Sequence, residues 1–440
     1  MKTDLTSGNI TSVLLKFAGP MIIGNLLQQI YNIADTLIVG RCLGENALAS
    51  VGSTYTLTTF LYSVIIGLCM GSGTLVSYYY GENNMKLLKT SINVSFFLTG
   101  TVSVIAEIIV LWKLSYILKL LQIPPEIMEM TTDYVKIIVS GIIFTFLYNF
   151  YAYISRGVGN SVTPLIFLGI SSIVNIVLDI VFVKFMDFGV KGAGYATLIA
   201  QVISGAGLAL YSVIKENILR IKISDIKFSR KEVYEVIRMS FTASLQQSVM
   251  NFGILMIQGL VNSFGTTVMA AFTVAVKIDA LAYMPAQEFG NAFSVFVSQN
   301  YGAGKNNRIK EGVKKSFKIS GIFCILISVT VVVFSTQLMK IFVDADEIPV
   351  IRTGRQYLIT EGAFYICIGF LFLFYGYYRG INRPEISLVL TVISLGTRVL
   401  LAYTLSPIQS IGVFGIWIAI PIGWILADIT GLIYMKKYEK

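Results

Sequence analysis

Four polar residues interrupt apolar stretches in the amino-terminal half of the sequence: Asp35, Asn175, Asp179 and Thr197. Asn175 and Asp179 are four residues apart, so on a helix they lie on one face, one turn apart. Counted from the outer ends of the apolar stretches, Asp35, Asp179 and Thr197 lie at similar depths. Their oxygen atoms can coordinate a hard cation, and two neighbouring carboxyl groups can instead share one proton. The four residues predict a coupling-ion site for H⁺ or Na⁺, and all four are metal ligands if the ion is Na⁺.

A second interpretation places the two carboxylates near the outer surface, where Asp35 would pair with Arg41 and Asp179 with Lys184. An ionisable side chain within a membrane span costs about 2.5–3.5 kcal/mol, so its presence there indicates a function. Asn175 and Thr197, taken singly, are also common hydrogen-bonding groups between helices. The similar depths favour the ion site, and both interpretations stay open.

The carboxy-terminal half carries different charges within apolar sequence: Lys277, Asp279, Glu288 and Arg398. Lys277 and Asp279 are two residues apart, which is about 200° around a helix, so we expect each to have its partner elsewhere. Glu288 lies beside helix-kinking residues, where a carboxylate could contact a substrate or cap the kink.

Five residues are candidates for contact with a transported substrate: Gln28, Tyr31, Met256, Met284 and Glu288. Aromatic faces attract flat organic cations, and methionine side chains adapt to ligands of different shapes. Taken singly, an aromatic or methionine residue in such a position more often serves ordinary packing between helices.

Membrane helices must position these residues, because the 440-residue chain is 55% hydrophobic and only 13% charged, with a mean hydropathy of +0.74. Soluble domains carry about 25% charged residues. One bilayer-crossing helix needs roughly 20 apolar residues. Apolar runs separated by charged breaks predict an all-α membrane protein with twelve spans, near residues 13–39, 50–79, 91–112, 134–154, 164–184, 190–214, 237–262, 267–299, 317–339, 357–378, 385–405 and 411–435.

The net charge of +10 comes mainly from Lys and Arg in short loops between apolar runs. By the positive-inside rule, these loops predict a multi-pass protein of the cell membrane with both termini in the cytoplasm, and they do not indicate a nucleic-acid partner. The amino terminus lacks the pattern of a cleaved signal peptide. The sequence has no histidine and four scattered cysteines. Without a metal-ligand cluster or a nucleophile motif, we expect no enzyme activity and no cofactor beyond the coupling ion.

The two halves of the chain repeat one another. Val76-Ser77 and Tyr80-Gly81 recur as Val297-Ser298 and Tyr301-Gly302, and Arg156-Gly157 recurs as Arg379-Gly380. Several matches in order at nearly constant offset indicate a duplicated unit. The repeat predicts a six-helix lobe at 1–214, a cytoplasmic linker helix at 215–236 and a second six-helix lobe at 237–440. Arg398 occupies the repeat position of Asn175, so we expect the ion site in one lobe only.

Several ordered segments resemble the multidrug and toxic compound extrusion (MATE) transporters. They are the first-helix segment from Pro20 to Gly40, Gly44–Gly52, Arg156–Pro164, Gly189–Thr197 and Ser298–Gly304. The resemblance implies a V-shaped pair of pseudo-symmetric six-helix bundles that alternates between outward- and inward-facing states. In the branch with an acidic first helix, the family's cation site maps onto Asp35, Asn175, Asp179 and Thr197. The chain departs from the sodium-coupled branch, whose acidic coupling groups lie in the carboxy-terminal lobe.

The function we expect is secondary active export of cationic or amphipathic small molecules, such as drugs, in antiport with H⁺ or Na⁺. The expected partners are those small molecules and the lipid bilayer, and the protein is expected to be a monomer. The alternative is a flippase for lipid-linked precursors from the related superfamily. A flippase needs a cationic cavity for pyrophosphate, whereas here only Lys277 and Arg398 could face such a cavity.

Overall fold

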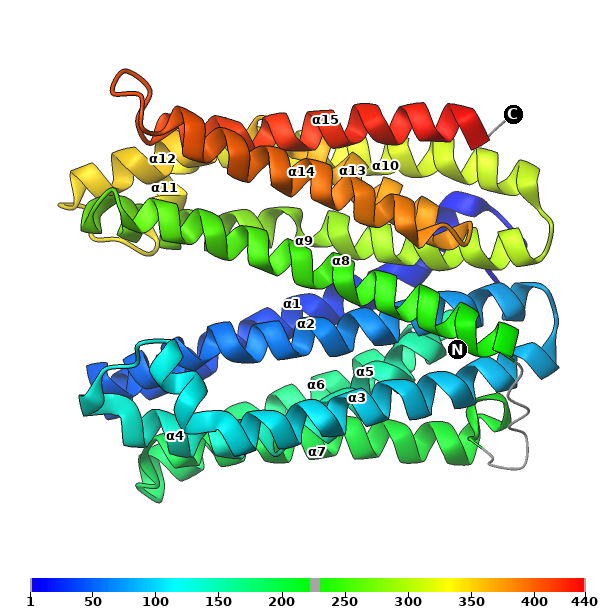
Figure 1. The fold of residues 1–440 in the computed structure, drawn as a ribbon, viewed down its shortest axis with the longest axis horizontal. Helices are drawn as coiled ribbons and strands as arrows, with labels where there is room; N and C mark the ends of the chain where they lie inside the picture. The colour runs from blue at the N-terminus through cyan, green and yellow to red at the C-terminus, as the bar shows by residue number, and fades with distance from the viewer. Residues whose placement is uncertain (1, 222–229, 439–440) are drawn as a thin grey trace. The chain divides into compact units, whose positions relative to one another are not determined.

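The computed structural model describes residues 2–221 and 230–438, and the only regular structure in these ranges is helical (Figure 1). The first eight helices are α1 (Ile10–Leu43), α2 (Glu45–Gly81), α3 (Met85–Leu120), α4 (Pro125–Val139), α5 (Ile142–Gly157), α6 (Val162–Asp179), the π-helix η1 (Ile180–Phe185) and α7 (Gly189–Lys215). After a short 3₁₀ turn, η2 (Asn217–Leu219), follow α8 (Arg230–Asn262), α9 (Thr266–Gly302), α10 (Asn306–Val333), α11 (Ser335–Lys340), α12 (Ile348–Gly362), α13 (Tyr365–Gly380), α14 (Pro384–Leu405) and α15 (Phe414–Tyr438).

Nine of the described helices are long and apolar enough to cross a membrane, and two bent pairs bring the number to eleven. The pairs are α4 with α5, bent by 41°, and α12 with α13, bent by 52°. The remaining predicted span corresponds to α8, which has 33 residues. At 1.5 Å per residue, α8 is about 50 Å long, enough to cross a bilayer, but residues such as Gln246 and Gln247 make it less apolar. Each predicted span therefore corresponds, within a few residues, to one helix or to two consecutive helices, as 317–339 does to α10 and α11.

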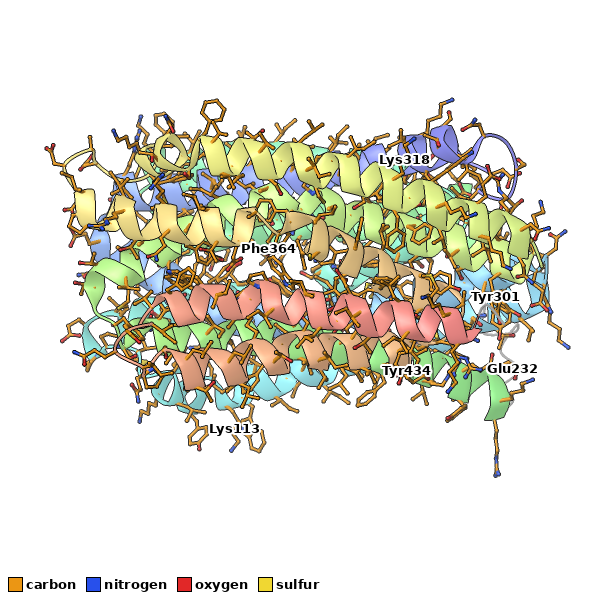
Figure 2. All side chains as sticks on the ribbon, turned by 90° about the horizontal axis from the view of Figure 1, so that it is seen from above. Lys113, Glu232, Tyr301, Lys318, Phe364 and Tyr434 are labelled. Carbon is orange, nitrogen blue, oxygen red and sulfur yellow. The ribbon has the colours of Figure 1, made fainter. Side chains whose placement is uncertain are left out.

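The internal repeat is visible in the geometry of the helices. α2 and α9 each have 37 residues, and each follows a glycine with positive φ, Gly44 at 82° and Gly265 at 91°. A left-handed backbone is readily adopted only by glycine, which explains glycine at both starts. The break between α4 and α5 recurs in the second half of the chain between α12 and α13, where Phe364 lies (Figure 2). The duplication read from the sequence is thus reproduced in helix lengths and breaks.

The chain forms two compact units, here called the amino-terminal unit (Met1–Asp4 with Gly19–Gln247) and the carboxy-terminal unit (Leu5–Ala18 with Ser248–Lys440). α1 and α8 are each divided between the units, and the division of α1 falls next to its internal proline, Pro20. The predicted linker helix, 215–236, includes residues 222–229, which lie outside the described residues. Its described parts are the end of α7, the turn η2 and the start of α8.

Helices within the amino-terminal unit approach closely wherever glycine faces a neighbouring backbone. A Cβ added at Gly157 on α5 would lie 2.9 Å from the carbonyl oxygen of Gly73 on α2. A Cβ added at Gly205 on α7 would lie 2.2 Å from the carbonyl oxygen of Phe144 on α5. In lipid, where the hydrophobic effect does not drive helices together, such close packing holds them in place.

In the carboxy-terminal unit, the segment before α1 is held by side chains of α9 and α10. Arg308 donates hydrogen bonds to the carbonyl oxygens of Leu5 at 3.3 Å, Ser7 at 2.5 Å and Gly8 at 2.8 Å. Asn300 also donates to the carbonyl oxygen of Leu5, at 3.0 Å. These contacts explain why Leu5–Ala18 belongs to the carboxy-terminal unit although it lies in sequence between the two parts of the amino-terminal unit.

Replacing this arginine should loosen the segment. We expect Arg308→Gln to speed amide hydrogen exchange in residues 5–12, because three charge-assisted hydrogen bonds, each worth about 1.5–3 kcal/mol, are weakened or lost. Hydrogen exchange read out by mass spectrometry measures this directly. Lys310→Gln, an exposed cation on the same helix, serves as the control. Equal exchange in both variants would show that Arg308 does not hold the segment.

Candidate ion-binding site

Asp35 and Asp179 come together in the amino-terminal unit. Asp35 lies on α1, and Asp179 is the last residue of α6, where the helix passes into the π-helix η1. The two carboxyl groups face and interact with each other directly. Asp179 has no exposed surface, and Asp35 is partly buried. π-Helical turns are found frequently at functional sites, and this one lies immediately after the carboxylate.

Asn175 and Thr197 complete the set that the sequence predicts. Asn175, one turn before Asp179 on α6, is 1% exposed and donates its amide hydrogen to the hydroxyl of Thr197 on α7, with 3.4 Å between the heavy atoms. Because the amide N–H points toward Thr197, the amide oxygen of Asn175 is left without a hydrogen-bond donor among the described residues.

Four buried acceptor oxygens of this cluster lack a donor in the described part of the chain. They are Asp35 Oδ1, Asn175 Oδ1 and both carboxyl oxygens of Asp179. A buried acceptor without a donor costs about 1–3 kcal/mol, and an uncompensated buried charge costs more. A cation or a shared proton would remove this cost, so the cluster has the chemistry of a site for a small cation.

The pairing with surface cations is not what the structure contains. Asp179 interacts electrostatically with Asp35 rather than with Lys184, and neither of its oxygens accepts a hydrogen bond from a described residue. The ammonium group of Lys184 instead lies 5.9 Å from the ring centroid of Phe185. The interaction of Asp35 is likewise with Asp179 and not with Arg41.

Tyrosines surround the carboxyl pair, and the sequence analysis missed two of them. Tyr31 and Tyr134 both lie within electrostatic reach of Asp35 and Asp179, and Tyr62 lies beside Tyr31. Gln201 on α7 donates a hydrogen bond of 3.0 Å to the hydroxyl of Tyr62. The repeat could have identified the missed residues, since Tyr62 and Tyr134 each recur as a tyrosine at the matching position of the second half, Tyr283 and Tyr357.

The predicted substrate contacts are divided between the units. Tyr31 lies next to the carboxyl pair, whereas Gln28, one turn earlier on α1, is exposed. Met256 on α8 is half-buried, and Met284 on α9 is buried. Glu288 on α9 is 8% exposed and accepts a hydrogen bond of 3.2 Å from Asn291, which in turn accepts one of 3.0 Å from Arg379. Of the five, only Tyr31 is placed beside the ion-binding cluster, and the roles of all five stay predictions.

A duplicated array of membrane-crossing helices with buried carboxyl groups among them is typical of membrane transporters. The family model for MatE matches residues 20–181 and 240–404, and the chain belongs to this family, the MATE transporters. It is therefore a multi-pass membrane transporter and not an enzyme.

Relatives and solved structures agree with this assignment over nearly the whole chain. The chain is 29% identical to the probable multidrug resistance protein YpnP of Bacillus subtilis (strain 168), covering 98% of this chain and 96% of that protein. It is 25% identical to the probable multidrug resistance protein NorM of Thermotoga maritima, covering 98% and 94%. A solved outward-facing multidrug resistance MATE family transporter superposes with a TM-score of 0.93 at 24% identity, covering 99% of this chain and 97% of that chain. The predicted all-α membrane fold is thereby confirmed.

Proposed function

We propose that the protein exports cationic or amphipathic small molecules in exchange for H⁺ or Na⁺, and that Asp35, Asn175, Asp179 and Thr197 bind the coupling ion. The multidrug resistance names of its relatives support export of small organic molecules. The distribution of Lys and Arg favours an orientation with both termini in the cytoplasm. In this orientation the proposed direction of transport is from the cytoplasm to the outside.

The group of four buried oxygens without donors among the described residues carries this proposal. They come from three residues on two helices, α1 and α6, while the hydroxyl of Thr197 adds α7. An ion that binds all three helices stabilises the arrangement in which they are close together. A ligand shifts a conformational equilibrium only by its different affinity for the two states, and an ion held by three helices has this difference.

The proposed cycle follows from charge. Without the ion, two buried carboxylates repel each other, and this repulsion favours separation of α1 from α6. With the ion bound, α1 packs against α6, and we propose that α1 bends to do so. The bent α1 lowers the affinity of the protein for the exported molecule. Release of the molecule outside and release of the ion inside then complete an exchange cycle.

Efflux from proteoliposomes tests the proposal. Purified protein is reconstituted, ethidium is the transported probe, and a pH gradient or a Na⁺ gradient is imposed separately. We expect one gradient to drive efflux, and Asp35→Asn to reduce driven efflux to the level of protein-free liposomes. The matched control is Asp133→Asn, which makes the same change in a carboxylate paired with Lys191 at 2.9 Å near the surface. Full driven efflux by Asp35→Asn would refute the assignment.

The same experiment separates export from the flippase alternative. A carrier of pyrophosphate-linked lipids needs free cationic side chains in its cavity. In the structure Arg398 interacts with the two carboxylates Asp279 and Glu361 and is therefore not free to bind a pyrophosphate. This observation favours a substrate that is not a polyanion. Failure of both gradients to drive ethidium, together with transbilayer movement of a pyrophosphate-linked lipid probe, would favour the flippase.

A further inference from the structure

A second carboxyl pair lies buried in the carboxy-terminal unit, in a place that the sequence analysis did not predict. Asp279 on α9 is 4% exposed and Glu361, near the end of α12, is 1% exposed. Their carboxyl groups interact directly with each other. Lys277, two residues from Asp279, is exposed. The expectation that Asp279 has its partner elsewhere is therefore confirmed.

The guanidinium of Arg398 on α14 lies within electrostatic reach of both carboxyl groups. Arg398 stands at the repeat position of Asn175, and Tyr357 stands at the repeat position of Tyr134, which borders the first carboxyl pair. The second cluster thus uses repeat-related positions of the first. A neutral amide in one unit is replaced by a permanent cation in the other.

Aromatic side chains enclose the second pair. The hydroxyl of Tyr357 donates to Asp279 Oδ2 at 3.4 Å, and Tyr365 lies beside the same carboxyl group. Trp417 on α15 stacks on Phe272, with ring centroids 5.5 Å apart, and meets the ring of Tyr357 edge-on at 4.9 Å. Tyr357, Tyr365 and Trp417 are each at most 1% exposed. The carboxyl pair is consequently shielded from water.

Some polar atoms of this cluster lack a hydrogen-bond partner among the described residues, and its charges do not sum to zero. Asp279 Oδ1, Glu361 Oε1 and Arg398 Nε are buried and have no hydrogen-bond partner among the described residues. Two carboxylates and one guanidinium leave one net negative charge, and an uncompensated charge in a low-dielectric interior is costly. The titratable and charged groups that face the pair are Tyr357 from α12, Tyr365 from α13 and Arg398 from α14. None of these supplies a second positive charge.

We propose that Asp279 and Glu361 share one proton beside Arg398, so that the carboxy-terminal unit has its own proton-binding site. A proton between the two carboxyl groups supplies the missing hydrogen bond and neutralises the remaining charge. The guanidinium repels a metal ion from the same position, so the site takes H⁺ in preference to Na⁺. The binding of a proton by Asp279 and Glu361 does not depend on the proposed antiport. Only the release and rebinding of this proton during transport rest on the proposed function.

Infrared difference spectroscopy of the purified protein tests the proposal without measuring transport. The wild type should show the carbonyl stretching band of a protonated carboxyl group at neutral pH, and this band should shift in deuterated water. The band should be lost in Glu361→Gln and in Asp279→Asn, and it should persist in a variant with both Asp35→Asn and Asp179→Asn. If neither Glu361→Gln nor Asp279→Asn removes a protonated-carboxyl band, the pair is fully ionised and the proposal is wrong.

Arg398→Gln provides a second and opposite signal. Without the fixed cation, both carboxyl groups need a proton, so a second protonated-carboxyl band should be gained. If no second band is gained, Arg398 does not set the charge of the pair, and this result would count against the proposal. Replacing choline chloride by NaCl at constant pH should leave the band unchanged, and loss of the band would assign the site to Na⁺. If these band changes are observed but neither gradient drives efflux, the antiport proposal is refuted and the proton-binding proposal stands.

Discussion

Asp179→Asn is expected to abolish gradient-driven efflux and, at the same time, to make the ion-free protein more stable. The wild-type carboxylate has no exposed surface, faces another carboxylate and receives no hydrogen bond from a described residue. An amide at this position carries no charge and can donate to Asp35. Removing an uncompensated buried charge should raise the free energy of unfolding by about 1–3 kcal/mol. When a residue serves function at a cost in stability, its replacement lowers activity and raises stability.

Two measurements on one preparation check this prediction. Thermal unfolding of the detergent-solubilised protein, in choline chloride without Na⁺ and at alkaline pH so that neither Na⁺ nor H⁺ occupies the site, should give a higher midpoint for Asp179→Asn than for the wild type. Efflux of ethidium should fall to the background level. Asp133→Asn is again the control, because loss of an exposed ion pair changes stability by at most about 1 kcal/mol. A variant that unfolds at a lower temperature and keeps driven efflux would refute the role of Asp179.

Gly376→Ala is expected to give a large loss of stability in the carboxy-terminal unit. Gly376 on α13 faces α9, and an added Cβ would lie 2.4 Å from the carbonyl oxygen of Gly290. The atom in contact is backbone within a helix, so it cannot move aside as a flexible side chain does. At Gly380, one turn further along α13, an added Cβ would lie 2.6 Å from Val297 Cβ. The two glycines form the small-xxx-small pattern that allows close approach of membrane helices.

The expected cost is about 1–3 kcal/mol or more, as for other overpacked contacts, and it should appear as a lower unfolding temperature and a smaller monodisperse fraction after purification. Gly396→Ala is the matched control. Gly396 is a helical glycine of α14 in the same unit, and an added Cβ would meet nothing within 4 Å. This control should be neutral or more stable by up to about 1 kcal/mol, because alanine is the better helix former. Equal behaviour of the two variants would show that α13 and α9 can separate without cost.

The sequence alone predicted most of the helices and their duplication, because both depend on local properties. Spans follow from runs of apolar residues, and the repeat follows from identical residues in the same order at a nearly constant spacing. Asp35, Asn175, Asp179 and Thr197 could be selected for the same reason, since polar residues stand out within apolar sequence. The family resemblance, which rests on ordered motifs, was confirmed by the family match and by the fold.

Only the tertiary structure decided which of these residues meet. The direct contact of Asp35 with Asp179, the tyrosines around them and the second pair of Asp279 with Glu361 join helices distant in sequence. Helical periodicity gives the face of a residue on its own helix but not the helix opposite that face. The π-helix after Asp179 and the breaks within the two bent pairs also change the direction of side chains beyond them. Composition and spacing therefore determined the class of this protein and its candidate residues, whereas the packing of helices determined which carboxyl groups form pairs and which cations reach them.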